Sequence, residues 1–178
     1  TVTAQPGHLN FTSIGTRDGL RSNSVNAIIK DRYGFMWFAT NDGLHKFDGT
    51  NFTVYRRRAG DSTSLRSNEI LALHEDAKGN LWVGTSGGAL SRYDRTQDCF
   101  VNYPRGISMG NARLGTHRGD SVHPARLLPS DLVRGVCSDL QGRIWIAQFS
   151  APYVLDPVTG RVSRIDLAPY TSDPAQKM

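Results

Sequence analysis

Short runs of apolar and β-branched residues, separated by Gly, Asp and Asn, recur along the chain. The first runs read SVNAIIK, FMWFAT, GLHKF and FTVYR, at 24–30, 35–40, 43–47 and 52–56. Runs of this length and composition are typical of strands. No long stretch shows the periodicity of a helix. The pattern therefore predicts a sheet of four short antiparallel strands within the first third of the chain.

The same pattern returns twice at fixed distances. Eight residues recur 45 positions further on: Leu20, Ser22, Asn23, Asp31, Gly34, Trp37, Thr40 and Gly43 become Leu65, Ser67, Asn68, Asp76, Gly79, Trp82, Thr85 and Gly88. A third copy, 63 positions after the second, keeps Leu128, Ser130, Asp139, Gly142 and Trp145, and has Asp131 where the second copy has Asn68. Four strands in every ~40–50 residues are the signature of a β-propeller blade.

The sequence therefore predicts an all-β fold with three blades of a larger ring, because propellers usually have about four to eight blades. The predicted units are blade 1 at 20–64, blade 2 at 65–127 and blade 3 at 128–178. The segment 1–19 precedes them. Within it FTSI, at 11–14, resembles the fourth strand of the first blade, and we expect it to be an outer strand that closes the ring.

The repeated residues are expected to be structural. DRYG places Asp31 first and Gly34 last in a type I turn, where the carboxylate accepts backbone N–H groups and Gly adopts the left-handed conformation. Trp37, in mid-strand, can pack against the next blade, although a ligand-stacking platform is an alternative. The same roles are expected for Asp76, Gly79, Trp82, Asp139, Gly142 and Trp145, with Thr40 and Thr85 in the repeated strand.

The chemistry-bearing motifs are few. The sequence has no G-x-S-x-G, HExxH or P-loop, and repeated aspartates spread around a ring cannot form an acid–base pair. We expect no catalytic residue, no metal and no cofactor. Cys99 and Cys137 are predicted on an outer and an inner strand about 14 Å apart, which is too far for a disulfide.

The net charge of +5 suits nucleic-acid binding, but most basic residues are dispersed, and we expect no nucleic acid as partner. YRRR, at 55–58, is interpreted as charge that protects the exposed edge of an outer strand. No apolar run is long enough to span a membrane, and TVTAQPGHLNF does not have the pattern of a signal peptide. These features fit a cytosolic protein or a mature exported one.

One segment, at about 104–127, departs from the repeat. Its Gly and Arg content favours a mobile surface excursion, and the functional alternative is contact with an acidic ligand or a partner domain. Arginine forks suit carboxylate and sulfate groups. The candidate ligand-binding residues are Arg113, His117, Arg118, His123 and Arg126.

DGLRSNSVNAIIKDRYGFMWFATNDGLHKFDGTNFTVYRR resembles the two-component regulator propeller repeat, and LRSNEILALHEDAKGNLWVGTSGGALSRYD resembles its next copy. The resemblance is strong from Leu9 to about Tyr103. It is weaker from Leu128 to Ile165, where Gln148 replaces the repeated Thr, and it fails around 105–127.

The resemblance implies the periplasmic sensor region of a bacterial hybrid two-component protein or a related diguanylate cyclase. Such a region is not catalytic itself and couples an external ligand, often an oligosaccharide, to a cytoplasmic output domain. The implied partners are downstream blades and domains of the same protein and a second copy in a homodimer. The membrane would be reached only through segments outside this chain. A protein-interaction propeller without output and a carbohydrate-active propeller enzyme are the alternatives.

Overall fold

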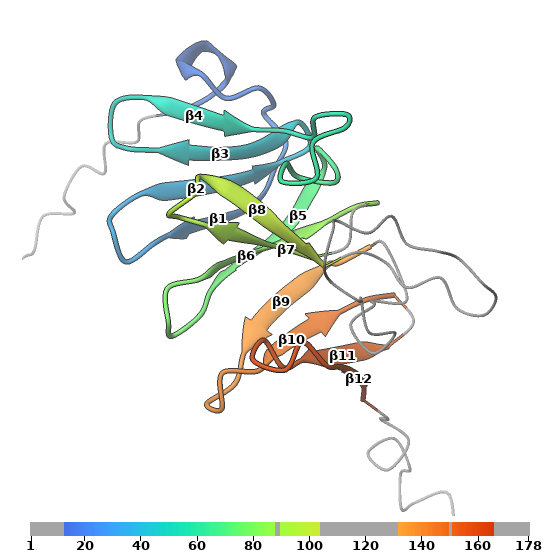
Figure 1. The fold of residues 1–178 in the computed structure, drawn as a ribbon. Coiled ribbons are helices and arrows are strands. Elements are labelled where there is room, and N and C mark those ends of the chain that lie inside the picture. Colours follow the sequence, from blue (N-terminus) through green and yellow to red (C-terminus); the bar gives the residue numbers. More distant parts are fainter. Residues whose placement is uncertain (1–12, 88–89, 104–131, 150, 166–178) are drawn as a thin grey trace, which may run out of the picture.

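The computed structural model describes residues 13–87, 90–103, 132–149 and 151–165, whose strands form three separate sheets (Figure 1). Each sheet is antiparallel, with its strands in chain order. The strands are β1 (Val25–Lys30), β2 (Met36–Thr40), β3 (Gly43–Phe47), β4 (Phe52–Tyr55), β5 (Ile70–Glu75), β6 (Leu81–Thr85), β7 (Leu90–Asp94), β8 (Cys99–Tyr103), β9 (Gly135–Ser138), β10 (Ile144–Ala147), β11 (Pro152–Leu155) and β12 (Val162–Arg164). One 3-10 turn, η1 (Thr16–Asp18), precedes them. The predicted fold class is confirmed.

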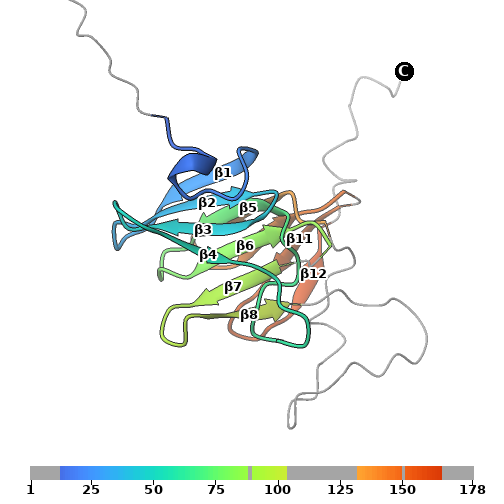
Figure 2. The same cartoon turned by 90° about the horizontal axis from the view of Figure 1, so that it is seen from above.

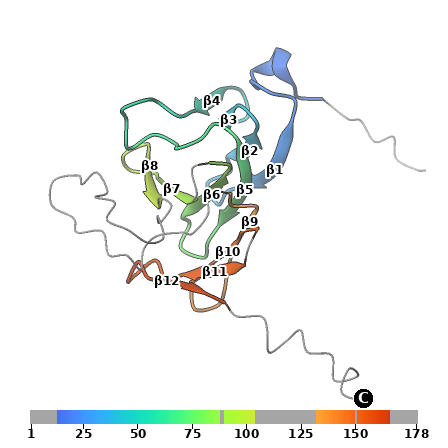
Figure 3. The ribbon, with the colours of Figure 1, turned by 90° about the vertical axis from the view of Figure 1, so that its right-hand side faces the viewer.

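Figure 2 shows the strands of blade 2 following one another from β5 to β8, and the three sheets are arranged as neighbouring blades of an arc. Figure 3 shows β1, β5 and β9 following one another on the inner side, with β4, β8 and β12 outermost. The blade-to-blade connections and the β2–β3 turns leave the sheets on one face, which we call the connection face. The β1–β2 and β3–β4 turns lie on the opposite face, which we call the turn face.

The core lies between the blades rather than inside any one of them. Trp37, fully buried on β2, packs on Tyr55 of its own blade and on Tyr93 of the next, with ring centroids 5.8 and 5.0 Å away. Trp82 belongs in the same way to a cluster with Ile144 and Leu155 of blade 3. Burial of such side chains stabilises the arc, at about 25 cal/mol per Å² of apolar surface.

The strands of each sheet fall within the predicted units, whose boundaries stay predictions. Of the proposed closing strand, residues 11–12 lie outside the described part, and Ser13 and Ile14 are not in a strand. The Thr16 amide donates to Asn23 Oδ1 (3.2 Å), as the Arg57 amide donates to Asn68 Oδ1 (2.8 Å). The equivalent Asn23 and Asn68 thus each accept a backbone amide from the chain before their blade, seven and eleven residues earlier, and the closing strand stays a prediction.

A buried histidine holds the same approach to blade 1. His45, on β3, is fully buried, and its Nε2 accepts the Arg21 amide (3.0 Å). Burial lowers the pKa of this imidazole, so the neutral form that can accept a hydrogen bond is favoured. The segment before β1 is thus attached to the sheet through a group that titrates.

Both cysteines lie where the repeat placed them, Cys99 on β8 and Cys137 on β9, and both thiols are free. Within the described residues, no helix has the length and apolar character needed to cross a bilayer.

Candidate functional site

In each blade, an aspartate in the turn between the first and second strands accepts a hydrogen bond from the tryptophan of the second strand. Asp31 Oδ1 accepts the amides of Tyr33 (3.0 Å) and Phe35 (2.9 Å), while Oδ2 accepts the indole N–H of Trp37 (2.8 Å). Gly34 completes the turn with a φ of 92°, in the left-handed region. The carboxylate thus fixes both the turn and the orientation of the tryptophan that packs on the next blade.

The other two blades repeat this geometry. Asp76 and Asp139 accept two turn amides each and the indole N–H of Trp82 and Trp145, both at 2.9 Å. Gly79 and Gly142 also have positive φ. The threonine of the repeat lies at the end of β2 and β6: Thr40 is buried, donates to the Gly43 carbonyl and accepts the Asp42 amide, and Thr85 is buried as well.

The fourth hydrogen-bond donor to the aspartate comes from the neighbouring blade in blade 1, and from the aspartate's own turn in blades 2 and 3. Arg95, from the β7–β8 turn of blade 2, contacts Asp31 Oδ2 of blade 1 at 2.8 Å. Asp76 receives the amide group of Asn80, and Asp139 receives Arg143 (2.7 Å), each from its own turn. Asn80 and Arg143 stand four residues after their aspartate, where blade 1 has an apolar Phe. Blade 1 therefore takes its fourth donor from its neighbour.

These donors hold the carboxylates ionised. Burial opposes ionisation of Asp31, but the hydrogen bonds from Trp37 and Arg95 outweigh it, and the pKa of Asp31 is lowered. The hydrogen bond from Trp145 is the main cause that lowers the pKa of Asp139 to about 2. None of the three is a proton donor near neutral pH, so the geometry gives them a structural use.

A second series of aspartates was missed by the sequence comparison. Asp48, Asp94 and Asp156 each accept two backbone amides two and three residues further on, in the β3–β4 type turns. They are 46 and 62 residues apart, so a search at offsets of 45 and 63 passes over them. All six repeated aspartates lie on the turn face.

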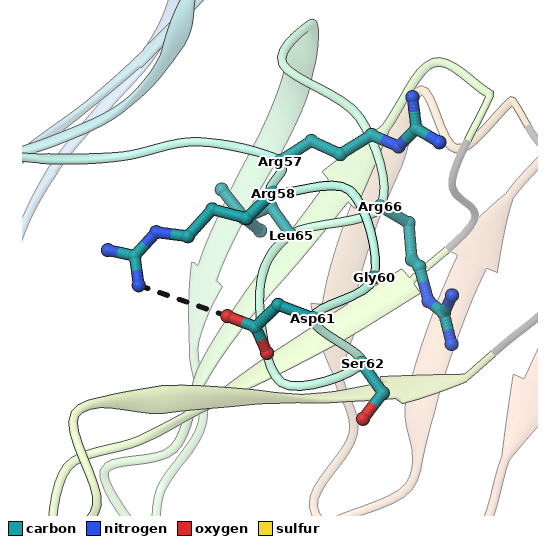
Figure 4. A pocket seen from close by; sticks show the side chains of 7 residues that line it. All are labelled: Arg57, Arg58, Gly60, Asp61, Ser62, Leu65 and Arg66. Atoms are coloured by element: carbon teal, nitrogen blue, oxygen red, sulfur yellow. Dashed lines mark ion pairs between the residues drawn. The ribbon is translucent and has the colours of Figure 1, made fainter.

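The connection face is rich in basic side chains where the turn face has the repeated aspartates, because the segment from β4 to β5 carries four arginines. A hollow of about 150 Å³ lies on this segment (Figure 4), lined by Arg57, Arg58, Gly60, Asp61, Ser62, Leu65 and Arg66. β4 ends at Tyr55, so these arginines follow the outer strand, as the sequence indicated. The interpretation that their charge protects the exposed edge stays a prediction. Arg56 pairs with Asp42 in the β2–β3 turn.

The hollow has a rigid base. The Ser64 hydroxyl accepts the Arg58 amide (2.9 Å), and Asn102 of β8 donates to the carbonyls of Ser62 and Ser64 (2.8 and 2.9 Å). Leu65 beneath is fully buried. The hydrogen bonds from Thr63 lower the pKa of the Asp61 carboxyl, which stays charged. The connection is thus a fixed loop between two blades.

The five predicted ligand-binding residues, Arg113, His117, Arg118, His123 and Arg126, lie outside the described residues, so their role stays a prediction. The structure does show where their segment is attached: the chain leaves β8 at Tyr103 and reaches β9 at Gly135, on the connection face. Among the residues described, no group of three His, Cys, Asp or Glu side chains is placed to hold a metal ion.

Comparison with known proteins agrees with the repeat geometry. The family model described as two component regulator propeller matches residues 19–42 and 64–87. The chain carries two-component regulator propeller repeats. These matches cover the first two strands of blades 1 and 2, including the hydrogen-bonded pairs Asp31–Trp37 and Asp76–Trp82. They confirm the resemblance expected from the sequence.

One protein similar in sequence is named histidine kinase P4 and comes from Formosa agariphila. It is 44% identical over 64 residues, which are 36% of this chain and 5% of that protein. The extracellular domain of a hybrid two component system from B. thetaiotaomicron matches with a TM-score of 0.72 and 25% identity, over 92% of this chain and 21% of that domain. The chain therefore spans only a small part of either relative.

A third likeness concerns the fold alone. Virginiamycin B lyase from Staphylococcus aureus matches with a TM-score of 0.55 and 13% identity, over 81% of this chain and 41% of the lyase. At that identity the likeness supports the propeller arrangement, and it transfers no chemistry.

Proposed function

We propose that this chain is the ligand-sensing propeller region of a bacterial signal-transduction receptor, located outside the cytoplasm in the periplasm. In this proposal the region is not catalytic itself. It couples binding of an external ligand, an oligosaccharide, to a cytoplasmic output domain such as a histidine kinase. The observation that carries the proposal is the match of the propeller repeats to the extracellular domain of a hybrid two component system.

The structure supports a division of labour between the two faces. On the turn face the repeated carboxylates are occupied by backbone amides and indoles. The connection face has arginines without such partners, and the segment with Arg113, His117, Arg118, His123 and Arg126 is attached there. Binding sites are commonly formed by loops on a rigid scaffold. The connection face is therefore the better surface for a ligand or a neighbouring domain.

Coupling follows if the ligand favours one of two arrangements of the receptor. The blades pack on one another through large aromatic side chains. In this proposal, binding at a loop acts on the relation between domains or between two protomers of a homodimer. The shift cannot exceed the difference in ligand affinity between the two arrangements.

The test uses the full-length receptor in membranes. Output activity is measured across a panel of oligosaccharides, with the wild-type receptor and a variant in which 104–127 is replaced by a short Gly/Ser linker. We expect one ligand class to change the output in the wild type and not in the variant. An output that responds to no external ligand would refute the sensor proposal, and hydrolysis of a glycan by the purified chain would favour the enzyme alternative.

A further inference from the structure

Two arginines on the blade 1 to blade 2 connection have no partner in the described structure. Figure 4 shows Arg57 and Arg66 extending from the loop toward one side, while Arg58 points to the other and pairs with Asp61. That pair is long, at 3.8 Å, and Arg58 remains 76% exposed. The neighbouring Arg56 differs, since Asp42 neutralises it. The hollow thus has open positive charge beside it.

The charge is fixed in place by the loop that carries it. The Arg57 amide donates to Asn68 Oδ1 (2.8 Å), and Arg66 follows Leu65, whose side chain is completely buried. Both backbone positions are therefore held by the packing between the blades. Arginines on a fixed base lose less conformational freedom on binding than arginines on a flexible loop.

The size of the hollow and the chemistry of its lining restrict the kind of ligand that it can bind. A volume of about 150 Å³ is below the ~300 Å³ at which ligand pockets begin, so the hollow suits one group of a larger molecule. A guanidinium is a planar fork that matches the two oxygens of a carboxylate and also binds sulfate. The hydroxyl of Ser62 and the carboxylate of Asp61 beside the hollow can accept sugar hydroxyls.

We propose that Arg57 and Arg66 form a subsite for an oxyanion group, a carboxylate or a sulfate, of an acidic saccharide. The saccharide part of this inference rests on the proposed sensor function, and the anion part rests on the two open guanidinium groups. The ligand lies along the connection face, with its charged group at the hollow and its neutral part on the surface around it.

The experiment is a calorimetric titration of the purified chain at low and high salt. The carboxylate arm uses a galacturonic acid trimer, with its methyl ester as the neutral control. The sulfate arm uses a sulfated galactose trimer, with its desulfated form as control. The variant Arg57→Gln/Arg66→Gln removes the subsite. Arg164→Gln, on the exposed β12, removes the same kind of charge elsewhere.

We expect one acidic trimer to bind, its neutral control to bind more weakly, and affinity to fall with salt. The double variant should weaken binding at least tenfold, because charge-assisted hydrogen bonds are lost, and Arg164→Gln should leave it unchanged. Arg57→Lys, which keeps the charge and loses the fork, should fall between.

Equal binding of the acidic trimer to the wild type and the double variant would overturn the subsite, as would binding of neither acid. If the neutral trimers bind as well as the acids, the subsite is refuted and the sensor function still stands. Normal acid binding by a receptor whose output does not respond would refute the sensor function and keep the subsite.

Discussion

Arg95 and Arg143 make nearly equal contacts to equivalent aspartates in different surroundings, and this permits a matched test of what an ion pair between blades contributes. Arg95 reaches Asp31 across the blade boundary at 2.8 Å, where the side chains are 22% and 0% exposed. Arg143 reaches Asp139 within one turn at 2.7 Å, where they are 48% and 18% exposed. We predict that Arg95→Met destabilises the chain much more than Arg143→Met.

The magnitude follows from the partners that remain. Arg95→Met also removes bonds to Glu75 (3.3 Å) and to the Gly79 carbonyl (3.2 Å), and the stacking of the guanidinium on Tyr33. Asp31 would keep three donors, so the cost is below the ~3–5 kcal/mol of a buried charge left alone. Hydrogen bonds to charged groups suggest about 2–3 kcal/mol. An exposed pair such as Arg143–Asp139 contributes little, because solvent screens it.

The assay is urea unfolding at pH 7 followed by tryptophan fluorescence, with Asp31→Asn and the double variant to complete a cycle. A coupling energy between Arg95 and Asp31 of about 1 kcal/mol or more is expected. Equal losses for Arg95→Met and Arg143→Met would refute the reasoning that burial decides the contribution. In the wild type, the stability from Asp31 is present above its ordinary pKa of 3.8 and is lost as pH falls through its lowered folded-state value.

Three further predictions concern other sites. Because the pKa of His45 is lowered from 6.5, stability should fall as pH drops below 6.5. Hydrogen exchange at the Arg21 amide, relative to its intrinsic rate, should then accelerate with falling pH, and pH-independent protection would contradict this. Gly84→Ala places a Cβ 2.7 Å from a side chain of blade 3 and should cost about 1–3 kcal/mol in urea unfolding, whereas a cost near zero would show that the blades can separate slightly. Alkylation without reductant should label exposed Cys137 before Cys99, whose thiol pKa is raised by burial, and mass spectrometry showing neither labelled would be inconsistent with free thiols.

The strands could be predicted because their signal is local. FMWFAT differs from β2 by one residue, since a short continuous apolar run between Gly34 and Asn41 marks where the strand begins and ends. The turn at Asp31 was accessible for the same reason. The bond from its carboxylate to the Trp37 indole was not, because that bond requires the hairpin to bring the sixth residue back over the turn.

Contacts between blades could not be predicted from the sequence. Arg95 and Asp31 are 64 residues apart, and no spacing rule connects them. Asp48, Asp94 and Asp156 were missed because small differences in loop length shift the offset by one residue. Three arginines of this connection were visible as YRRR, but the hollow depends on how the loop between β4 and β5 folds back on itself, which no local pattern predicts.

The borrowed donor of blade 1 bears on how such a chain can evolve. The residue after the second aspartate is Gly49 in blade 1, Arg95 in blade 2 and Pro157 in blade 3. A recombination event that deleted the second repeat would place Pro157 where Asp31 requires a guanidinium. Tandem repeats recombine easily in DNA, yet here a single residue, Arg95, makes blade 1 depend on having blade 2 as its neighbour. A blade that looks like a duplicate is in this respect no longer exchangeable with its neighbours.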